Sequence, residues 1–245
     1  MVATSQSDNT ERMLPYHNIA EGKRIFVLGN GPSLLTHDLT KLAGEDTFCC
    51  NSIGEWEALP FAPTYYGVSD LWEYKWLERN RFPHWGRTER FNVRFQGWPD
   101  HDAFLNVEKA PDSIQVFSHG CVGLTDTLPA IPTARTTPLT LAQLALWMGY
   151  TDIYMMGIEQ TRGYAYDPEA IVSMTGRHSF PIDKNPKYQL GIQRCAKRMR
   201  EDMESAGRHI YDMTPEGLLN GRSASRRNVP VMEILEYRDY EEVLA

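Results

Sequence analysis

The sequence has 245 residues, is 42% hydrophobic and carries a formal charge of −7. A chain of this length and composition can bury a full core, which favours one α/β domain with an appendage. The negative charge argues against a nucleic-acid-binding surface, because phosphate backbones are bound by clustered Lys and Arg. The chain has neither the ~18 uninterrupted apolar residues of a membrane span nor the layout of a signal peptide at its start. We therefore expect a cytoplasmic protein without an integral membrane segment.

The cysteines show neither a CxxC pair nor the spacing of a disulfide framework. They are Cys49, Cys50, Cys121 and Cys195. Reduced thiols and the absence of a zinc site are the expectation for such a pattern.

The first predicted element is a buried strand at residues 25–28, which follows a polar, poorly ordered lead-in over residues 1–20. The strand runs into a tight loop with the sequence Gly29-Asn30-Gly31-Pro32-Ser33. Glycines at positions 29 and 31 remove side chains that would hold a phosphate or sugar away from the backbone. Asn30 and Ser33 bring polar groups to the same place. A nucleotide-binding loop and an ordinary strand-to-helix turn both fit, since the run is neither GxGxxG nor a P-loop.

Strands and helices alternate along the rest of the chain. The apolar runs predict strands at residues 47–50, 64–68, 90–95, 114–117, 152–158 and 209–213. Helical periodicity predicts helices at residues 34–42, 71–80, 141–148 and 185–207. This alternation predicts an α/β fold, with a mostly parallel sheet and helices on both faces.

Three segments connect or close this predicted domain, which covers residues 21–220. The proline-rich segment 128–138 is interpreted as a connection or lid, and residues 160–185 as a long, polar, lid-like loop. Residues 221–245 are expected to form a C-terminal packing tail.

Polar residues follow several predicted strands at the point where each strand ends. Asn51 and Ser52 follow the strand at 47–50, Asp70 comes soon after the next strand, and Glu159 ends the strand at 152–158. Open α/β sheets bind their ligands along the carboxyl ends of the strands. The pattern therefore predicts a ligand site at this rim, shared with the loop at 29–33.

Five short motifs occur in a recognisable order: GNGPSL at 29–34, CN at 50–51, LALWMGYTDIYMMGIE at 144–159, YAYD at 164–167 and IYDMTPEGLL at 210–219. In this order they resemble bacterial sialyltransferases that use CMP-sialic acid. In looser form they resemble a wider group that includes archaeal-type 6-hydroxymethylpterin diphosphokinases. The resemblance covers roughly residues 23–220 and implies a single Rossmann-like, GT-A-type domain that works without a metal.

The resemblance implies a nucleotide-binding role for several residues on the predicted rim. Asn30 and Ser33 match loop residues that hold the phosphate and ribose, and Asn51 matches an asparagine that contacts the cytidine part. Thr137 falls where the family has a serine beside the donor phosphate. Glu159 stands where the family has an aspartate.

The resemblance also implies candidates for catalysis. Tyr164 matches one of two tyrosines that assist the departing CMP phosphate, whereas the second aligns with Thr161. Arg135 lies close to the position of a substrate-contacting arginine. The loop with the family's general-base histidine is shortened, so His178 is the nearest histidine and Asp183 is a candidate for the same place.

Chemistry supports these roles independently of the resemblance. Sugar transfer needs a base for the acceptor hydroxyl and hydrogen-bond donors for the leaving phosphate. The imidazole of His178 suits the base, because its ordinary pKa lies near physiological pH, and the hydroxyl of Tyr164 suits the phosphate. Asp100 and Asp102 form a DxD pattern, but they follow a turn-like Gly-Trp-Pro segment and are interpreted as a solvated turn rather than a metal site.

Three functions from different classes remain open. The first is a glycosyltransferase that needs no cofactor and transfers a sialic-acid-like sugar from a CMP-linked donor to a glycan or other hydroxyl acceptor. The second is a pterin-type diphosphokinase, which would use ATP and Mg²⁺ held by carboxylates such as Asp70, Glu159 or Asp183. The third is a catalytically inactive nucleotide-binding module. A homo-oligomer is compatible with all three.

Overall fold

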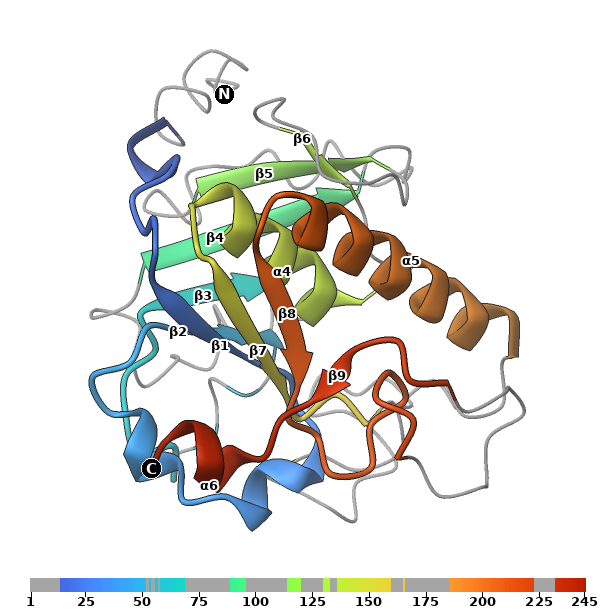
Figure 1. The fold of residues 1–245 in the computed structure, drawn as a ribbon. Helices are drawn as coiled ribbons and strands as arrows, with labels where there is room; N and C mark the ends of the chain where they lie inside the picture. The colour runs from blue at the N-terminus through green and yellow to red at the C-terminus, as the bar shows by residue number, and fades with distance from the viewer. Residues whose placement is uncertain are drawn as a thin grey trace, which may run out of the picture.

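The computed structural model describes the chain in several stretches, to which the structural statements below refer. These are residues 14–51, 53, 56, 58–68, 89–95, 114–119, 130–132, 136–159, 165, 186–222 and 232–245. Within them, nine strands form one sheet in the order β6-β5-β4-β3-β2-β1-β7-β8-β9, and each neighbouring pair is parallel (Figure 1).

Seven of the nine strands match strands predicted from the sequence, whereas β6 lies in the segment interpreted as a connection or lid and β9 in the predicted C-terminal tail. The nine strands are β1 (Arg24–Leu28), β2 (Thr47–Cys50), β3 (Tyr65–Val68), β4 (Glu89–Phe95), β5 (Ile114–His119), β6 (Ala130–Pro132), β7 (Asp152–Met156), β8 (His209–Asp212) and β9 (Glu236–Tyr237). The chain builds the sheet outward from β1 to β6, then returns to place β7 on the other side of β1. The order of strands therefore reverses between β1 and β7, which is where open α/β sheets place their ligands.

Helices cover both faces of this sheet. On one face, α4 (Thr137–Trp147) and α5 (Pro186–Ser205) pack against the side chains of Ile25 and Val27 on β1. On the other face, Phe26 and Leu28 pack with residues of two short 3-10 helices and of the last helix. These are η2 (Pro32–Thr36), η3 (Leu39–Leu42) and α6 (Tyr240–Val243). The predicted mostly parallel α/β sheet with helices on both faces is thus confirmed.

Helix α4 is buried along its whole length. Because α4 leads into β7, it runs antiparallel to the strands, and its first residues lie at the carboxyl rim. A helix without a solvent-facing side shows no amphipathic pattern, which explains why the predicted helix, 141–148, misses the first turn of α4.

Several predicted elements differ in the structure. Residues 34–42 form the separate turns η2 and η3 instead of one short helix, because His37 between them is extended (φ −111°, ψ 145°). Residues 14–20, assigned to the poorly ordered lead-in, include η1 (Leu14–Tyr16) and pack on the end of α4. There Ala20 N donates to Met148 O at 2.9 Å. The predicted helix at 71–80 lies outside the described residues.

The prediction of reduced thiols is wrong for Cys195, which is disulfide-bonded. Cys49 and Cys50 are buried and are not part of a disulfide, and burial raises the pKa of the Cys49 thiol. Cys121 lies outside the described residues. Disulfides are typical of oxidising compartments. The disulfide therefore gives no support to the cytoplasmic location, which stays a prediction. Among the described helices, none combines the length and apolar composition of a membrane span.

Candidate functional site

The loop after β1 lies directly against the segment after β7. Gly29 N donates to Met156 O at 2.8 Å, and Gly31 N donates to Gly157 O at 2.9 Å. A Cβ atom added to Gly29 would overlap the carbonyl oxygen of Gly157, and one added to Gly31 would overlap the carboxylate of Glu159. Both glycines are therefore required by the close approach of the two loops, a reason that the sequence alone did not supply.

Glu159 joins these two loops. Its side chain is only 6% exposed, and its Oε1 accepts a hydrogen bond from the backbone N–H of Ser33 at 2.5 Å. Backbone N–H groups at such a turn are the usual partners of a bound phosphate. In this structure, one of them is taken by a carboxylate of the chain itself, at the rim position where the sequence predicted Glu159.

Asn51 and Thr137 connect the end of β2 with the start of α4. Asn51 Nδ2 donates to Thr137 Oγ1 at 3.3 Å. Asn51 has a left-handed backbone conformation (φ +48°), which asparagine tolerates better than most residues and which recurs at functional sites. Two residues for which the resemblance implied separate contacts with the donor are thus hydrogen-bonded to each other.

The N-terminus of α4 adds a favourable electrostatic field beside Asn51. Thr136 caps the helix by accepting a hydrogen bond from Leu139 N at 3.4 Å, and the proline at position 138 suits the first turn. The free N–H groups and the macrodipole of a helix N-terminus favour anions. This end of α4 therefore suits a phosphate held near Asn51.

Three buried oxygen atoms at the rim have no hydrogen-bond partner among the described residues. They are Asn30 Oδ1, Ser33 Oγ and Asn51 Oδ1. A buried polar group left without a partner costs about 1–3 kcal/mol, and most such groups in folded proteins are satisfied. These three atoms belong to residues for which the sequence predicted contact with a nucleotide. A polar ligand would supply the missing partners.

The segment after β8 contributes a set of buried polar residues that the sequence analysis did not propose. Ile158 N donates to Thr214 Oγ1 at 3.2 Å, and Thr214 N donates to Asp212 Oδ1 at 2.9 Å. Asn220 Nδ2 donates to Thr214 O at 2.6 Å. This set fixes the backbone just before Glu159. The sequence feature that could have indicated these residues is the polar run after the strand at 209–213, which served above only as part of the family resemblance.

The YAYD motif is tied to the loop after β1 through its backbone. Ala165 N donates to Asn30 O at 2.8 Å, and Ala165 is buried. Other predicted site residues lie outside the described residues, and their roles stay predictions. They are Ser52, Asp70, Arg135, Tyr164, His178 and Asp183. Among the described residues, no group of three or more His, Cys, Asp or Glu side chains is arranged to hold a metal ion.

Comparison with solved structures identifies a related fold. The chain is similar to the monofunctional α-2,3-sialyltransferase Cst-I from Campylobacter jejuni, with a TM-score of 0.53 and 17% sequence identity. The match covers 86% of this chain and 81% of that chain. No protein-family model and no curated protein matches the sequence. At this identity the likeness establishes the sialyltransferase-like α/β fold alone.

Proposed function

We propose that this protein is a glycosyltransferase that transfers a sialic-acid-like sugar from a CMP-linked donor to a hydroxyl acceptor. The observation that carries the proposal is the set of unsatisfied buried oxygens of Asn30, Ser33 and Asn51. They gather where the strand order reverses, which is the usual position of a nucleotide in such a sheet. The likeness in fold to a sialyltransferase supports the choice of reaction.

Asn51 favours a cytosine base. Its Nδ2 is engaged by Thr137, so its Oδ1 remains as a hydrogen-bond acceptor. The exocyclic amino group of cytosine donates hydrogen bonds, whereas uracil carries a carbonyl oxygen at the same ring position. A buried acceptor left facing another acceptor is strongly disfavoured, so we expect CMP to bind more tightly than UMP.

The phosphate would lie between Ser33 and the N-terminus of α4. The Ser33 hydroxyl can donate to a phosphate oxygen, and the helix dipole favours the negative charge. Transfer also needs a base for the acceptor hydroxyl, for which His178 and Asp183 are the proposed candidates. Tyr164 would donate to the leaving CMP phosphate, and Arg135 would contact the substrate.

Thermal unfolding in the presence of nucleotides tests the proposed donor class. The panel is CMP, UMP, CDP, UDP and ATP, each with and without Mg²⁺. Metal-independent stabilisation that is largest for CMP supports the proposal, because a ligand that binds only the folded state raises its melting temperature. Stabilisation only by ATP with Mg²⁺ would contradict it and favour the diphosphokinase.

A matched pair of serine variants locates the binding site. Ser33→Ala removes one of the unsatisfied hydroxyls and should reduce the shift caused by CMP. Ser205→Ala removes an exposed hydroxyl that bonds Asp202 O at the end of α5 and should leave the shift unchanged. Equal shifts in the two variants would exclude Ser33 from the nucleotide site.

Donor hydrolysis tests the catalytic residues. His178→Ala and Asp183→Ala are compared for release of CMP from a CMP-linked sugar, and loss in only one variant identifies the base. The nucleotide-binding module without catalysis is favoured instead if the unmodified protein binds CMP but hydrolyses no CMP-linked sugar.

A further inference from the structure

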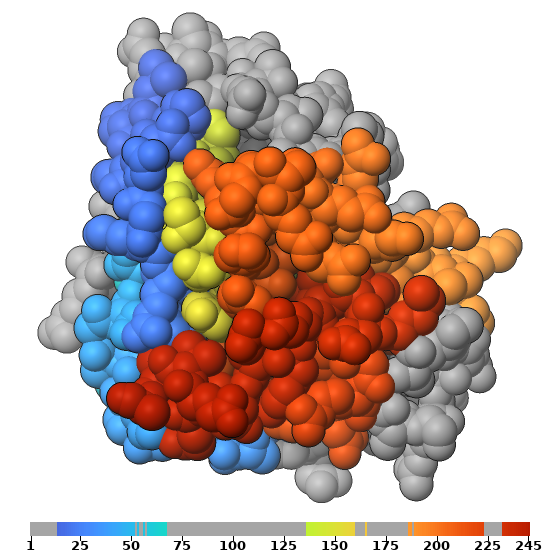
Figure 2. Space-filling model, viewed as in Figure 1, coloured from blue at the N-terminus to red at the C-terminus, as the bar shows by residue number. Residues whose placement is uncertain are grey.

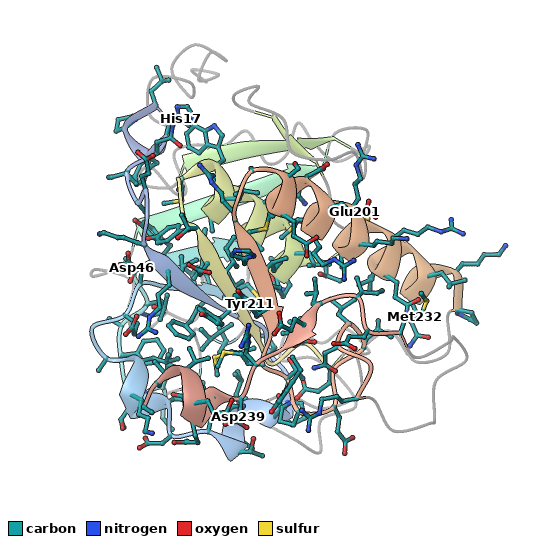
Figure 3. The ribbon with its side chains drawn as sticks, viewed as in Figure 1. His17, Asp46, Glu201, Tyr211, Met232 and Asp239 are labelled. Atoms are coloured by element: carbon teal, nitrogen blue, oxygen red, sulfur yellow. The ribbon has the colours of Figure 1, made fainter. Side chains whose placement is uncertain are left out.

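One face of the sheet is partly open over the amino-terminal halves of β1, β7 and β8. On this face Asp152 and Tyr154 of β7 and His209 and Tyr211 of β8 are partly or fully exposed, whereas Met156 at the end of β7 is buried. Parallel strands are normally covered on both faces. Figure 2 shows atoms of β7 at the surface beside those of β8, and Figure 3 places Tyr211 near the middle of this area. The amino-terminal parts of β7 and β8 are therefore accessible to a partner.

Aromatic rings form a row that runs from the buried ring of Phe26 to the partly exposed rings of Tyr154 and Tyr211. Phe26 on β1 is in register with Tyr154 on β7, and their ring centroids are 5.2 Å apart. Tyr154 is in register with Tyr211 on β8, with ring centroids 5.1 Å apart. Arg24 lies over the Phe26 ring and Arg238 over the Tyr211 ring. Stacked rings held between two guanidinium groups lose little freedom on binding, which suits a protein interface.

Both ends of the row carry an ion pair. At the β1 end, Arg24 pairs with Glu45 at 2.7 Å, and at the β9 end, Arg238 pairs with Glu236 at 2.8 Å. Positive and negative charges are therefore balanced along the row. Nucleic acids and anionic membranes select clustered positive charge, so this face does not fit either of them.

The charges are self-complementary under a two-fold rotation. A two-fold axis that lies in the plane of the interface, parallel to the strands and between Tyr154 and Tyr211, places the β1 end of one copy opposite the β9 end of the other. Arg24 of one copy then faces Glu236 of the other copy, and Glu45 faces Arg238 of the other copy. Such symmetry is the commonest in homo-oligomers, where the same patch is used by both subunits.

We propose that this surface binds a second copy of the chain to form a two-fold symmetric dimer. We call it the β7–β8 face and define it by Arg24, Glu45, Tyr154, Tyr211, Glu236 and Arg238. It has an aromatic centre and a charged rim, as specific protein interfaces do. The candidate site lies at the carboxyl ends of the strands. The β7–β8 face lies closer to their amino-terminal ends, so a dimer formed there leaves the candidate site accessible.

Light scattering coupled to size exclusion, supported by sedimentation velocity, tests this dimer with the full chain. The expected mass is twice the chain mass of 28.1 kDa. Tyr211→Glu introduces a charge at the centre of the β7–β8 face and should give the single-chain mass. Met232→Glu adds the same charge at an exposed residue away from Tyr211, and should keep the double mass (Figure 3).

Two charge-reversal variants test the dimer even if Tyr211→Glu does not fold. Arg238→Glu and Glu45→Arg should each weaken the dimer at least about tenfold, because like charges then meet across the interface. An equimolar mixture of the two variants should restore dimers, since each supplies the charge that the other lacks. A single-chain mass for the unmodified protein at about 100 μM overturns the proposal. Retention of the dimer by both Tyr211→Glu and Arg238→Glu also overturns it.

Discussion

Glu159 shows how a single side chain organises the candidate site. It stands at the end of β7, yet its hydrogen bond to Ser33 N joins residues that are 126 positions apart. Gly31 makes room for its carboxylate, because any larger residue there would occupy the same space. The loop after β1 therefore depends on β7 for its shape.

Replacing Glu159 should reveal the strength of this link. Glu159→Ala leaves the buried Ser33 N–H without its acceptor and should lower the free energy of unfolding by about 1–3 kcal/mol. Glu159→Gln keeps an acceptor oxygen and should lose less. Urea unfolding followed by circular dichroism measures both. Equal losses in the two variants would show that the hydrogen bond to Ser33 contributes nothing.

His37 should make stability depend on pH. Its ring lies tilted against that of Tyr240, and its Nε2 is buried without a partner among the described residues. Burial lowers the pKa of His37 below the ordinary 6.5, against the opposing influence of Asp239 and Glu241. The unfolded chain therefore takes up a proton first as pH falls. The stabilisation from neutral His37 is complete above pH 6.5 and is lost as pH falls through the lowered folded pKa.

The measurement for His37 is the free energy of unfolding from pH 8 to pH 5, compared with that of His37→Gln. The unmodified protein should lose more stability over this range than the variant, whose side chain does not titrate. Parallel pH profiles for the two proteins would refute the contribution of His37.

At the scale of elements, α4 packs closely against the sheet at Gly67 on β3. A Cβ atom added there would overlap the side chain of Leu141, which is fully buried. Gly67→Ala should therefore destabilise the fold by about 1–3 kcal/mol through overpacking, and Leu141→Ala by about 2–5 kcal/mol through a cavity.

The double variant of Gly67 and Leu141 tests whether the two residues share this space. The added methyl group would fill part of the cavity, so the combined loss should be smaller than the sum of the single losses. A double-mutant cycle by chemical denaturation gives the coupling. Additive losses would mean that the two side chains do not meet.

The sequence predicted the centre of the sheet well because strands such as β1 and β2 are buried apolar runs that end at polar residues. Asn51 and Thr137 were proposed for the donor site only through a family resemblance, and their hydrogen bond to each other was not predicted. The sequence prediction failed at residues 34–42, where local hydrogen bonds decide the outcome: Asp38 accepts from Thr40 N and starts a new turn after the extended His37. The hydrogen bond between Glu159 and Ser33 was not predictable either, because it depends on how closely two distant loops approach.

At the scale of the whole molecule, the C-terminal helix α6 packs on the short helices that follow β1. Tyr240 is 1% exposed, and its hydroxyl donates to Asp38 O at 2.7 Å. Arg24 Nη1 donates to Val243 O at 3.1 Å, which attaches the same helix to β1. The end of the chain thus supports the segment that carries the candidate nucleotide loop.

Two variants of Tyr240 separate packing from hydrogen bonding. Tyr240→Phe removes only the bond to Asp38 and should lower the free energy of unfolding by about 0.5–1.5 kcal/mol. Tyr240→Ala also empties a buried ring site and should cost about 3–5 kcal/mol. Thermal unfolding of both variants provides the measurement. An unchanged melting temperature in Tyr240→Ala would show that α6 does not support the fold.

The pairing of β1 with β7 also constrains how the protein is made. The loop after β1 is synthesised early, but Glu159 follows Ser33 by 126 residues, which takes about 6–25 s at ordinary rates of translation. Through that interval the loop after β1 lacks Glu159, which shapes it, and β1 lacks its neighbouring strand β7. Contacts so distant in sequence form slowly, so the nascent chain should need protection from aggregation until β7 has left the ribosome.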